Sequence, residues 1–384
     1  MAIMKQTSRI ISTYTADTMG VASALFEFGG MTVMHDASGC NSTYNTHDEP
    51  RWYDFDSMVY ISALTETEAV MGDDEKLITD IVSAADDLSP RFIAIAGTPI
   101  PMMAGTDLKS IARVIENRTG IPSFGFQTNG MHSYIDGAAE AFLGLAQRFV
   151  KADSSKTDSL SVNILGLTPL DFSINSTADS IKSILTENGI KIVSSWAMGS
   201  ELSAIENSAA AHVNLVLSQC SVKAAVYMQQ NFDIPYVVGV PIGKSFSEKI
   251  INDIKTAADK NKSIISFNDR STQNADIAII GEGVCSASLA KAISLETGKN
   301  VKVICPLTVE KAFLQSGDSV AFSEEDIEAQ VGNIKYVIAD PMYKPICGKK
   351  SKFISLPHEA FSGRIYRKDI PDLVSGFDFS ILNS

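Results

Sequence analysis

The hexapeptide His35-Asp36-Ala37-Ser38-Gly39-Cys40 places an imidazole, a carboxylate and a thiol at the end of an apolar run. The run, residues 31–34, predicts a short buried strand, and Gly39 permits a tight turn into a helix that begins near Cys40. A thiol at a helix N-terminus lies at the positive end of the helix dipole, which favours the thiolate. Because thiolate binds metals and attacks electrophiles, the hexapeptide indicates metal or redox chemistry. The alternative is a buried cysteine that only fills space.

The remaining cysteines are widely spaced along the chain: Cys220, Cys285, Cys305 and Cys347. An odd number of cysteines without a Cys-x-x-Cys pair argues against a disulfide framework and against a self-contained zinc or ferredoxin-type site. Any cluster would have to be assembled from distant residues or from two chains. Cys220 and Cys347 fall in or beside loops that follow expected strands, whereas Cys285 and Cys305 have apolar surroundings and are expected in the core.

His358 follows an expected strand and Pro357, where an imidazole can be a metal ligand or a proton donor. A loop histidine with a purely structural role is the alternative. Two glycine-containing stretches superficially resemble nucleotide-binding loops. Residues 240–245 lack the first glycine of a phosphate loop, because Val238 stands at that position, and residues 281–283 lack the third glycine of a dinucleotide fingerprint. The sequence therefore does not favour nucleotide binding at either stretch.

Strands and helices alternate at the spacing of right-handed βαβ units, which predicts parallel sheets. The alternation begins three times, and the polar residues 151–159 indicate a linker after the first unit. We therefore expect an α/β protein with three tandem Rossmann-like domains and mostly parallel sheets around a central cleft. The expected domains are 1–152 with the Cys40 motif, 160–270 with Cys220, and 275–384 with the His358 motif.

Ligands of such sheets bind at the carboxyl ends of the strands. The loops expected at those ends are 35–40, 62–72, 97–105, 166–172, 194–200, 218–221, 239–244, 281–286, 305–308 and 340–348. A helix is expected over 173–187, closed by Gly189.

The chain has 384 residues and a formal net charge of −13, without a cluster of lysines and arginines. This balance argues against nucleic-acid binding. No apolar run reaches 18 residues, and the first residues lack the apolar region and cleavage site of a signal peptide. These observations predict a cytoplasmic protein that does not associate with membranes.

Taken together, five collinear stretches resemble the component 1 family of nitrogenase. This family includes the nitrogenase large subunits, their cofactor-assembly scaffolds, and the dark-operative protochlorophyllide and cofactor-F430 reductases. Residues 35–40 resemble the family's His-Gly-x-x-Gly-Cys, whose cysteine ligates an iron–sulfur cluster at the subunit interface. Residues 64–72 are similar to the element Thr-Glu-x-x-x-Val-Phe-Gly-Gly, and residues 97–108 to a Cys-x5-Gly-Asp-Asp-Leu loop. Residues 214–236 and 357–363 resemble the segments that carry the cofactor cysteine and the cofactor histidine of the catalytic nitrogenase subunit.

The chain departs from the family at two cysteine positions. Pro99 stands where the third loop would carry one, and a second is absent near Val59. Cys40 is therefore the only clear interface ligand that the resemblance implies, with Asp36 able to supply oxygen ligands. A homodimer would pair two Cys40 residues, and a heterodimer with a related component 1 subunit richer in cysteine is the other solution. Cys220 falls two residues beyond the nitrogenase cofactor cysteine, which indicates a slipped alignment or a lost ligand.

The resemblance implies a nitrogenase-like oxidoreductase subunit of an anaerobic system. An ATP-dependent reductase similar to the nitrogenase iron protein would deliver electrons to an interface cluster, expected to be 4Fe-4S. A substrate other than N2 would be reduced in the cleft, which could hold a second metal cofactor or a tetrapyrrole. The alternatives are an assembly scaffold or carrier for a metal cluster or tetrapyrrole, and a partner subunit without a cluster.

The residues implied for these roles fall into three sets. Those expected to bind a cofactor are Cys40, Asp36, His35, Cys220 and Gly39, and the metal ligands among the candidates are Cys40, Cys220 and His358. The catalytic candidates are His358, as proton donor, and Arg364, which could hold an anionic group.

Overall fold

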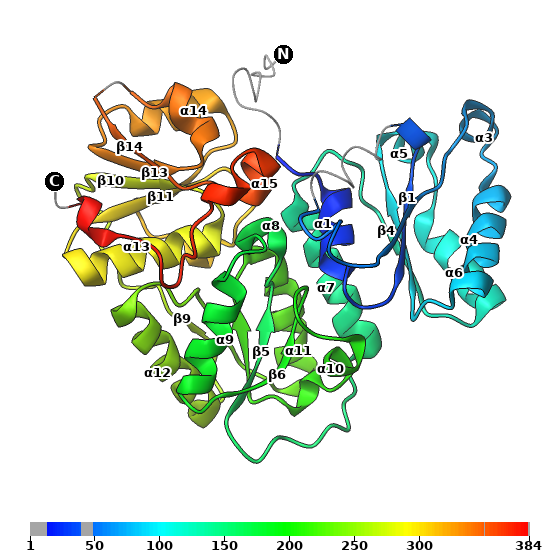
Figure 1. Ribbon diagram of the computed structural model, residues 1–384, viewed down its shortest axis with the longest axis horizontal. Helices are drawn as coiled ribbons and strands as arrows, with labels where there is room; N and C mark the ends of the chain where they lie inside the picture. Colours follow the sequence, from blue (N-terminus) through cyan, green and yellow to red (C-terminus); the bar gives the residue numbers. More distant parts are fainter. Residues whose placement is uncertain (1–13, 40–48, 349, 383–384) are drawn as a thin grey trace.

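The computed structural model of the chain describes residues 14–39, 49–348 and 350–382. Its strands form three separate sheets, and every strand pairing within them is parallel. The three sheets follow one another in the chain and surround a common centre (Figure 1). The expected α/β fold class, with three Rossmann-like units, is confirmed. In the described residues, no helix has the length and apolar character needed to cross a membrane.

The first sheet has the strand order β2-β1-β3-β4. Its strands are β1 (Met31–His35), β2 (Met58–Ile61), β3 (Ile93–Gly97) and β4 (Ser123–Phe126). Its helices are α1 (Asp17–Leu25), α3 (Glu66–Met71), α4 (Asp74–Leu88), α5 (Pro99–Ala104), α6 (Leu108–Thr119) and α7 (Tyr134–Phe149). Alternate residues of β3 face opposite layers, so Ile93 and Ile95 pack under α4 and α6, while Ala94 and Ala96 pack against α1 and α7.

The second sheet has the order β6-β5-β7-β8-β9. Its strands are β5 (Ser161–Leu165), β6 (Lys191–Ser195), β7 (Val213–Val216), β8 (Tyr236–Val238) and β9 (Ile264–Ile265). Its helices are α8 (Pro169–Phe172), α9 (Thr177–Glu187), α10 (Leu202–Glu206), the 3₁₀ turns η1 (Ser208–Ala210) and η2 (Gln219–Ser221), α11 (Val222–Phe232) and α12 (Lys244–Lys260). Its strands are buried almost throughout, as expected for a sheet covered on both faces.

The third sheet has the order β12-β11-β10-β13-β14. Its strands are β10 (Ile277–Ile280), β11 (Val301–Cys305), β12 (Ser319–Val320), β13 (Tyr336–Ala339) and β14 (Lys352–Ser355). Its helices are α13 (Gly283–Thr297), α14 (Glu324–Val331) and α15 (Glu359–Ser362). The 3₁₀ turns are η3 (Lys311–Phe313), η4 (Pro341–Ile346), η5 (Gly363–Ile365), η6 (Arg367–Asp369) and η7 (Phe379–Leu382). The chain after α15 then runs back toward the second sheet (Figure 1).

The three units share one continuous apolar core, and polar contacts reinforce their junctions. Helix α7 packs against both α1 and α11, so it fills the space between the first and second sheets (Figure 1). Beside it, the buried guanidinium of Arg51 donates hydrogen bonds to Glu49, to Glu27 and to the carbonyl oxygen of Ala197. At the third sheet, the backbone N–H of Thr15 donates to the carbonyl oxygen of Ala360.

Three details differ from the sequence expectation. The loop expected over 97–105 contains the short helix α5, because Pro99 at its first position has a fixed φ that suits a helix start. The helix expected over 173–187 is split into α8 and α9, because Ser173 has a φ of +57° and breaks the helical path. Helix α12, of 17 residues, has no counterpart among the expected elements.

Candidate functional site

One imidazole and three buried carboxylates meet at the centre of the molecule, and we call this set the His358 junction: His358, Asp171, Glu282 and Asp340. Each carboxylate comes just after a strand, since α8 follows β5, Glu282 follows β10, and Asp340 follows β13. The carboxyl ends of parallel strands therefore bring together groups from the second and third sheets, as the strand-end rule predicts.

His358 is held by its backbone and by ring packing. Its N–H donates to Oδ2 of Asp340 at 2.8 Å, and its ring lies 4.5 Å from the Phe361 ring, centroid to centroid. Its Nε2 is 3.4 Å from Oδ1 of Asp171. Both ring nitrogens are fully buried, and neither has a hydrogen-bond partner among the described residues. The imidazole is therefore free to accept or donate a proton to a group that enters beside it.

Asp171 links the junction to the first sheet. Its Oδ1 accepts the hydroxyl proton of Tyr134, at the start of α7, at 2.5 Å, and its Oδ2 accepts from Oγ1 of Thr168 at 3.1 Å. Burial, and then the charge of Asp171, raise the pKa of Tyr134 well above its usual range. Tyr134 therefore remains a hydrogen-bond donor at neutral pH, and side chains from all three units take part in one buried network.

Glu282 joins the second and third sheets. Its Oε1 accepts the backbone N–H groups of Gln219 at 2.9 Å and Val284 at 3.1 Å, and its Oε2 accepts that of Cys285 at 2.7 Å. Burial, followed by the nearby charge of Asp171, raises the pKa of Glu282 to about 7, against the lowering effect of these three hydrogen bonds. The Glu282 carboxyl thus changes its protonation near neutral pH.

Asp340 is a second buried acid whose pKa lies above its ordinary value, because burial outweighs its hydrogen bonds. Those bonds come from the backbone N–H groups of Met342 and His358 and from the hydroxyl of Ser362. An acid-rich, water-poor site with a raised pKa on two carboxyls can store and pass protons.

The cavity enclosed by the junction has a volume of about 30 Å³. One or two water molecules occupy that much space, whereas pockets for small molecules usually measure about 300–1,000 Å³. A tetrapyrrole or a metal cluster therefore does not fit beside His358 in this conformation. In the described residues, no set of three or more His, Cys, Asp or Glu side chains has the arrangement needed to hold a metal ion.

The other candidates expected near His358 lie elsewhere. Cys220, in η2, is fully buried but does not line the cavity, and burial, then Asp171, raise the pKa of its thiol well above the usual range. Arg364, in η5, is exposed and also lies outside the cavity lining. Cys285 does line the cavity, and Cys347 is half-buried in the turn after η4. Of the expected cleft residues, only His358 is therefore at the junction.

The end of β1 forms a second polar site, which carries the hexapeptide. Nδ1 of His35 is 2.8 Å from Oγ of Ser62, which follows β2, and Oγ1 of Thr98, which follows β3, donates to the His35 carbonyl oxygen at 2.9 Å. Burial lowers the pKa of His35, so its ring is neutral at neutral pH. Asp36 is buried, and its Oδ1 accepts the N–H of Ala37 at 2.9 Å. The three strand-end loops therefore meet as expected, while Cys40 itself lies outside the described residues.

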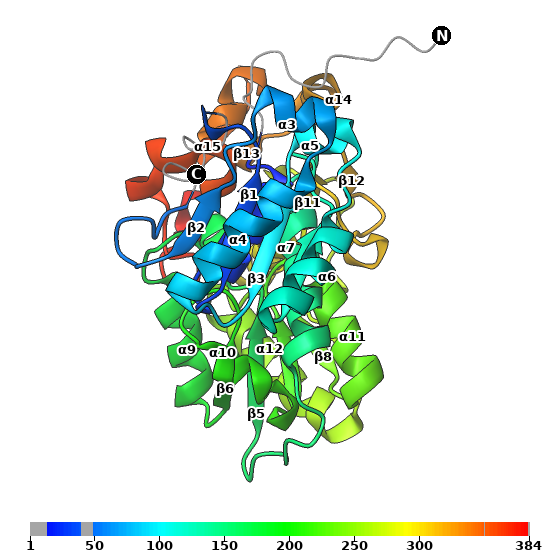
Figure 2. The same ribbon diagram turned by 90° about the vertical axis from the view of Figure 1, so that its right-hand side faces the viewer.

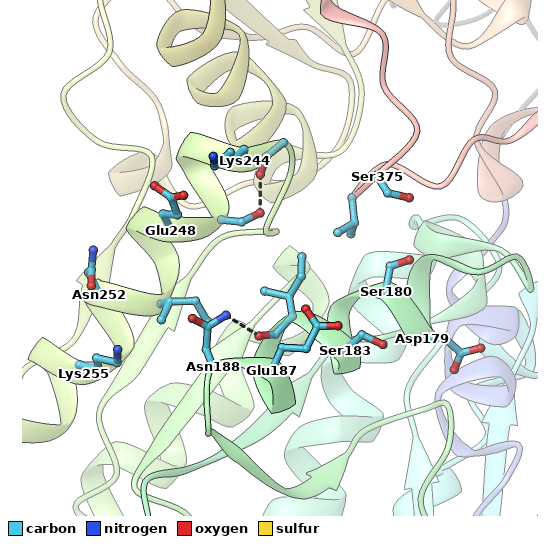
Figure 3. Close-up of a pocket in the computed structure, with 15 residues that line it drawn as sticks. Asp179, Ser180, Ser183, Glu187, Asn188, Lys244, Glu248, Asn252, Lys255 and Ser375 are labelled. Atoms are coloured by element: carbon cyan, nitrogen blue, oxygen red, sulfur yellow. Dashed lines mark hydrogen bonds between the residues drawn. The ribbon is translucent and has the colours of Figure 1, made fainter.

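The largest surface pocket is a groove of about 820 Å³ between α9 and α12 (Figure 3). At its upper end, α12 begins at Gly243, within the stretch that superficially resembles a phosphate loop. A carboxylate already occupies the position where a phosphate would bind, because Oε1 of Glu296 accepts the N–H of Ser245 at 2.8 Å. This geometry agrees with the rejection of nucleotide binding from the sequence.

Sequence reasoning identified the loops of the junction but not most of its residues. Asp171, Glu282 and Asp340 lie in or next to three of the expected strand-end loops, so a search for carboxylates in those loops would have found them. Tyr134 carries no comparable signal, because it is the first residue of an otherwise ordinary amphipathic helix.

The arrangement defines a class: a protein of three parallel α/β sheets whose strand-end loops converge on one buried centre. The family model described as nitrogenase component 1 type oxidoreductase matches residues 17–313. The chain therefore belongs to the nitrogenase component 1 type oxidoreductase family.

Individual relatives and a solved structure agree with this membership. The chain is 27% identical over 193 residues to a light-independent protochlorophyllide reductase subunit from Huperzia lucidula, covering 48% of this chain and 38% of that protein. It is 22% identical over 273 residues to the corresponding protein from Synechococcus elongatus, which has the same name, covering 63% and 54%. The chain thus spans less than two thirds of these relatives. A structure titled "Nitrogenase Cp1 at pH 6.5" shares its fold, with a TM-score of 0.70, 17% identity, and coverage of 98% of this chain and 92% of that one.

Proposed function

We propose that this chain is a subunit of a nitrogenase-like reductase and that it contributes Cys40 to an iron–sulfur cluster shared with a second subunit. An ATP-dependent iron–sulfur reductase would deliver the electrons, and the substrate, other than N2, would meet this chain at the His358 junction. Family membership and the relatives named as parts of a protochlorophyllide reductase support the reaction class. Such a cluster supplies one-electron transfer when bound.

The observation that carries the proposal is the surface around the end of β1. Six exposed apolar side chains, which we call the apolar patch, lie on α3, on α5 and in the turn after β4: Val70, Met71, Ile100, Met102, Met103 and Met131. Val70 and Met103 are 79% and 82% exposed. Helices α3 and α5 contact each other at one end of the first unit (Figure 2). A patch of this kind on a protein surface marks a protein interface, and it lies beside the loops that meet at His35.

The described residues of the hexapeptide suit a cluster at such an interface. Asp36 offers a buried carboxylate at the strand end, and the neutral His35 ring is held by Ser62 and so keeps the backbone in position. Cys40 is the only cysteine among residues 1–219, so this chain alone offers one thiolate to the interface. Four-iron clusters usually take four ligands, which explains why a second subunit is needed.

The decisive experiment measures iron, acid-labile sulfide and oligomeric mass on protein purified without oxygen. A homodimer with about two irons per chain would indicate one four-iron cluster held by paired Cys40 residues, and a cysteine-rich partner in the complex would indicate a heterodimer. Cys40→Ala should remove the iron, whereas Cys347→Ala, at a half-buried cysteine in the third unit, should retain it. Iron that persists in Cys40→Ala would refute the assignment.

The second candidate is a partner subunit without a cluster of its own. The specific observation in its favour is the closed His358 junction, whose cavity of about 30 Å³ leaves no room for a large cofactor. A folded dimer without iron after anaerobic purification would support this candidate. A scaffold or carrier would instead show bound iron that moves to an acceptor protein without turnover.

A further inference from the structure

One segment of the chain separates the small His358 cavity from the large surface groove. Residues 366–375, which we call the C-terminal strap, follow α15 and cross from the third unit to the second (Figure 1). Ile370, Pro371 and Leu373 line the cavity, whereas Val374 and Ser375 line the groove. The strap is therefore a common wall of the two spaces.

The strap is fixed at both ends by polar contacts. At its beginning, the guanidinium of Arg367 donates two hydrogen bonds, at 2.9 and 2.6 Å, to Oε1 of the buried Glu359. At its end, the N–H of Gly243, just before α12, donates to the carbonyl oxygen of Val374 at 3.2 Å. Between these points the strap has only one 3₁₀ turn, so little secondary structure holds it closed.

The middle of the strap is held to α9 by Asp372. Its carboxylate accepts from the hydroxyls of Ser180 at 2.5 Å and Ser176 at 3.2 Å, and also from Ser375 and the N–H of Val374 within the strap. Figure 3 shows Ser375 on the strap near Ser180 of α9. Burial alone would raise the pKa of Asp372, but these hydrogen bonds together hold it below its ordinary value, so the carboxylate is charged at neutral pH.

We propose that the C-terminal strap is a gate between the α9–α12 groove and the His358 cavity, and that Asp372 is its latch. Opening the strap would join a groove of about 820 Å³ to the cavity and give access to His358. The proposal rests on the proposed function in placing the substrate at the His358 junction. It accounts for a reductase whose innermost site holds only a water or two when closed.

The two spaces also indicate the class of substrate. The groove carries both charge signs around an apolar floor, with Lys244 and Lys255 on α12 and Glu187 on α9, while Ile184 and Ile251 lie below. The inner cavity is lined by three acids and one imidazole, which repel an anionic group. The substrate that fits is amphipathic: its charged end stays in the groove and a neutral end reaches His358.

The gate is tested by the reactivity of Cys285, which lines the cavity behind the strap. N-ethylmaleimide labelling under native conditions, read by mass spectrometry for each cysteine, should be at least tenfold faster at Cys285 in Asp372→Ala than in the parent. Tenfold corresponds to about 1.4 kcal/mol, the scale of one hydrogen bond to a charged group. Asp369→Ala is the matched control, because Asp369 is exposed on the same strap and its carboxylate makes no hydrogen bond in the described residues.

Cys220 and Cys305 are internal controls, because both are buried and neither lines the cavity. The latch is wrong if Cys285 reacts at the parental rate, or if all three cysteines accelerate together. Should Asp372→Ala fail to fold, Ser180→Ala removes the 2.5 Å contact and leaves the carboxylate in place. None of these measurements requires a cluster, so failure of the gate is distinguishable from failure of the Cys40 assignment.

The route is tested separately by blocking the groove. In the Asp372→Ala background, a bulky maleimide attached first to Ser183→Cys, an exposed position on the α9 wall, should slow labelling of Cys285 severalfold. An unchanged rate with the groove blocked would show that access to the cavity runs elsewhere and would overturn the proposed path.

Discussion

Replacing Glu282 with glutamine should change how the stability of the protein depends on pH. The carboxyl of Glu282 has a pKa of about 7 in the folded protein, raised from 4.5 by burial and by Asp171. Between these two values the folded chain binds more protons than the unfolded chain, so the folded state loses stability as pH rises. Glutamine does not titrate, and Glu282→Gln should therefore lack this loss.

The expected magnitude follows from the two pKa values. From pH 5 to pH 8, a group that shifts from 4.5 to about 7 lowers the free energy of unfolding by about 2.5 kcal/mol. With about 2.1 cal/mol/K of unfolding entropy per residue over the 384 residues, this equals about 3 °C in the thermal midpoint. The parent should lose that much relative to Glu282→Gln between the two pH values, with the two proteins closest at pH 5.

The assay is a thermal melt of both proteins at pH 5, 6, 7 and 8, followed by circular dichroism. The matched control is Glu296→Gln, because Glu296 also accepts a backbone N–H at a helix start but is exposed. That variant should keep the pH dependence of the parent. Parallel curves for the parent and Glu282→Gln would refute the reasoning, since they would show that the buried carboxyl does not titrate in this range.

Two further substitutions test the contacts that join the three units. Tyr134→Phe removes the hydroxyl that donates to Asp171 and should cost about 1.5–3 kcal/mol, or about 2–4 °C in the same melt, because a buried carboxylate loses a donor; an unchanged midpoint would mean that this hydrogen bond adds nothing to stability. Arg51→Ala leaves Glu49 and Glu27 without their buried cation and should cost about 3–5 kcal/mol, with Arg51→Lys milder, as measured by unfolding; equal loss in both variants would point to packing instead of charge.

The sequence alone predicted the class of fold because the relevant signals are local. The apolar runs at residues 58–61 and 336–339 correspond residue for residue to β2 and β13, and Asp73 caps α4 as its position before the helix indicates. Alternation of strands and helices fixes parallel sheets, since a crossover of this length returns the chain in the same direction. The resemblance added the family, which the family model bears out.

Local signals misled where a few residues had to satisfy neighbours far along the chain. Helix α12 follows Pro241 and Gly243, which locally favour a loop, yet its buried residues pack on β8 and α13. Ser173 divides an otherwise continuous helical pattern, and its hydroxyl donates to Glu359, 186 residues away. Such contacts leave no periodicity in the sequence.

The site divides in the same way. The sequence determined which loops meet, because the ends of parallel strands share one edge, and it singled out His358 and the residues around Cys40. Only the tertiary structure decided that His358 faces Asp171 and Glu282, that Cys220 and Arg364 lie away from the cavity, and that the C-terminal strap closes over it. The physical reason is that burial, pKa and enclosure depend on what surrounds a side chain in space, and those neighbours come from three separate parts of the chain.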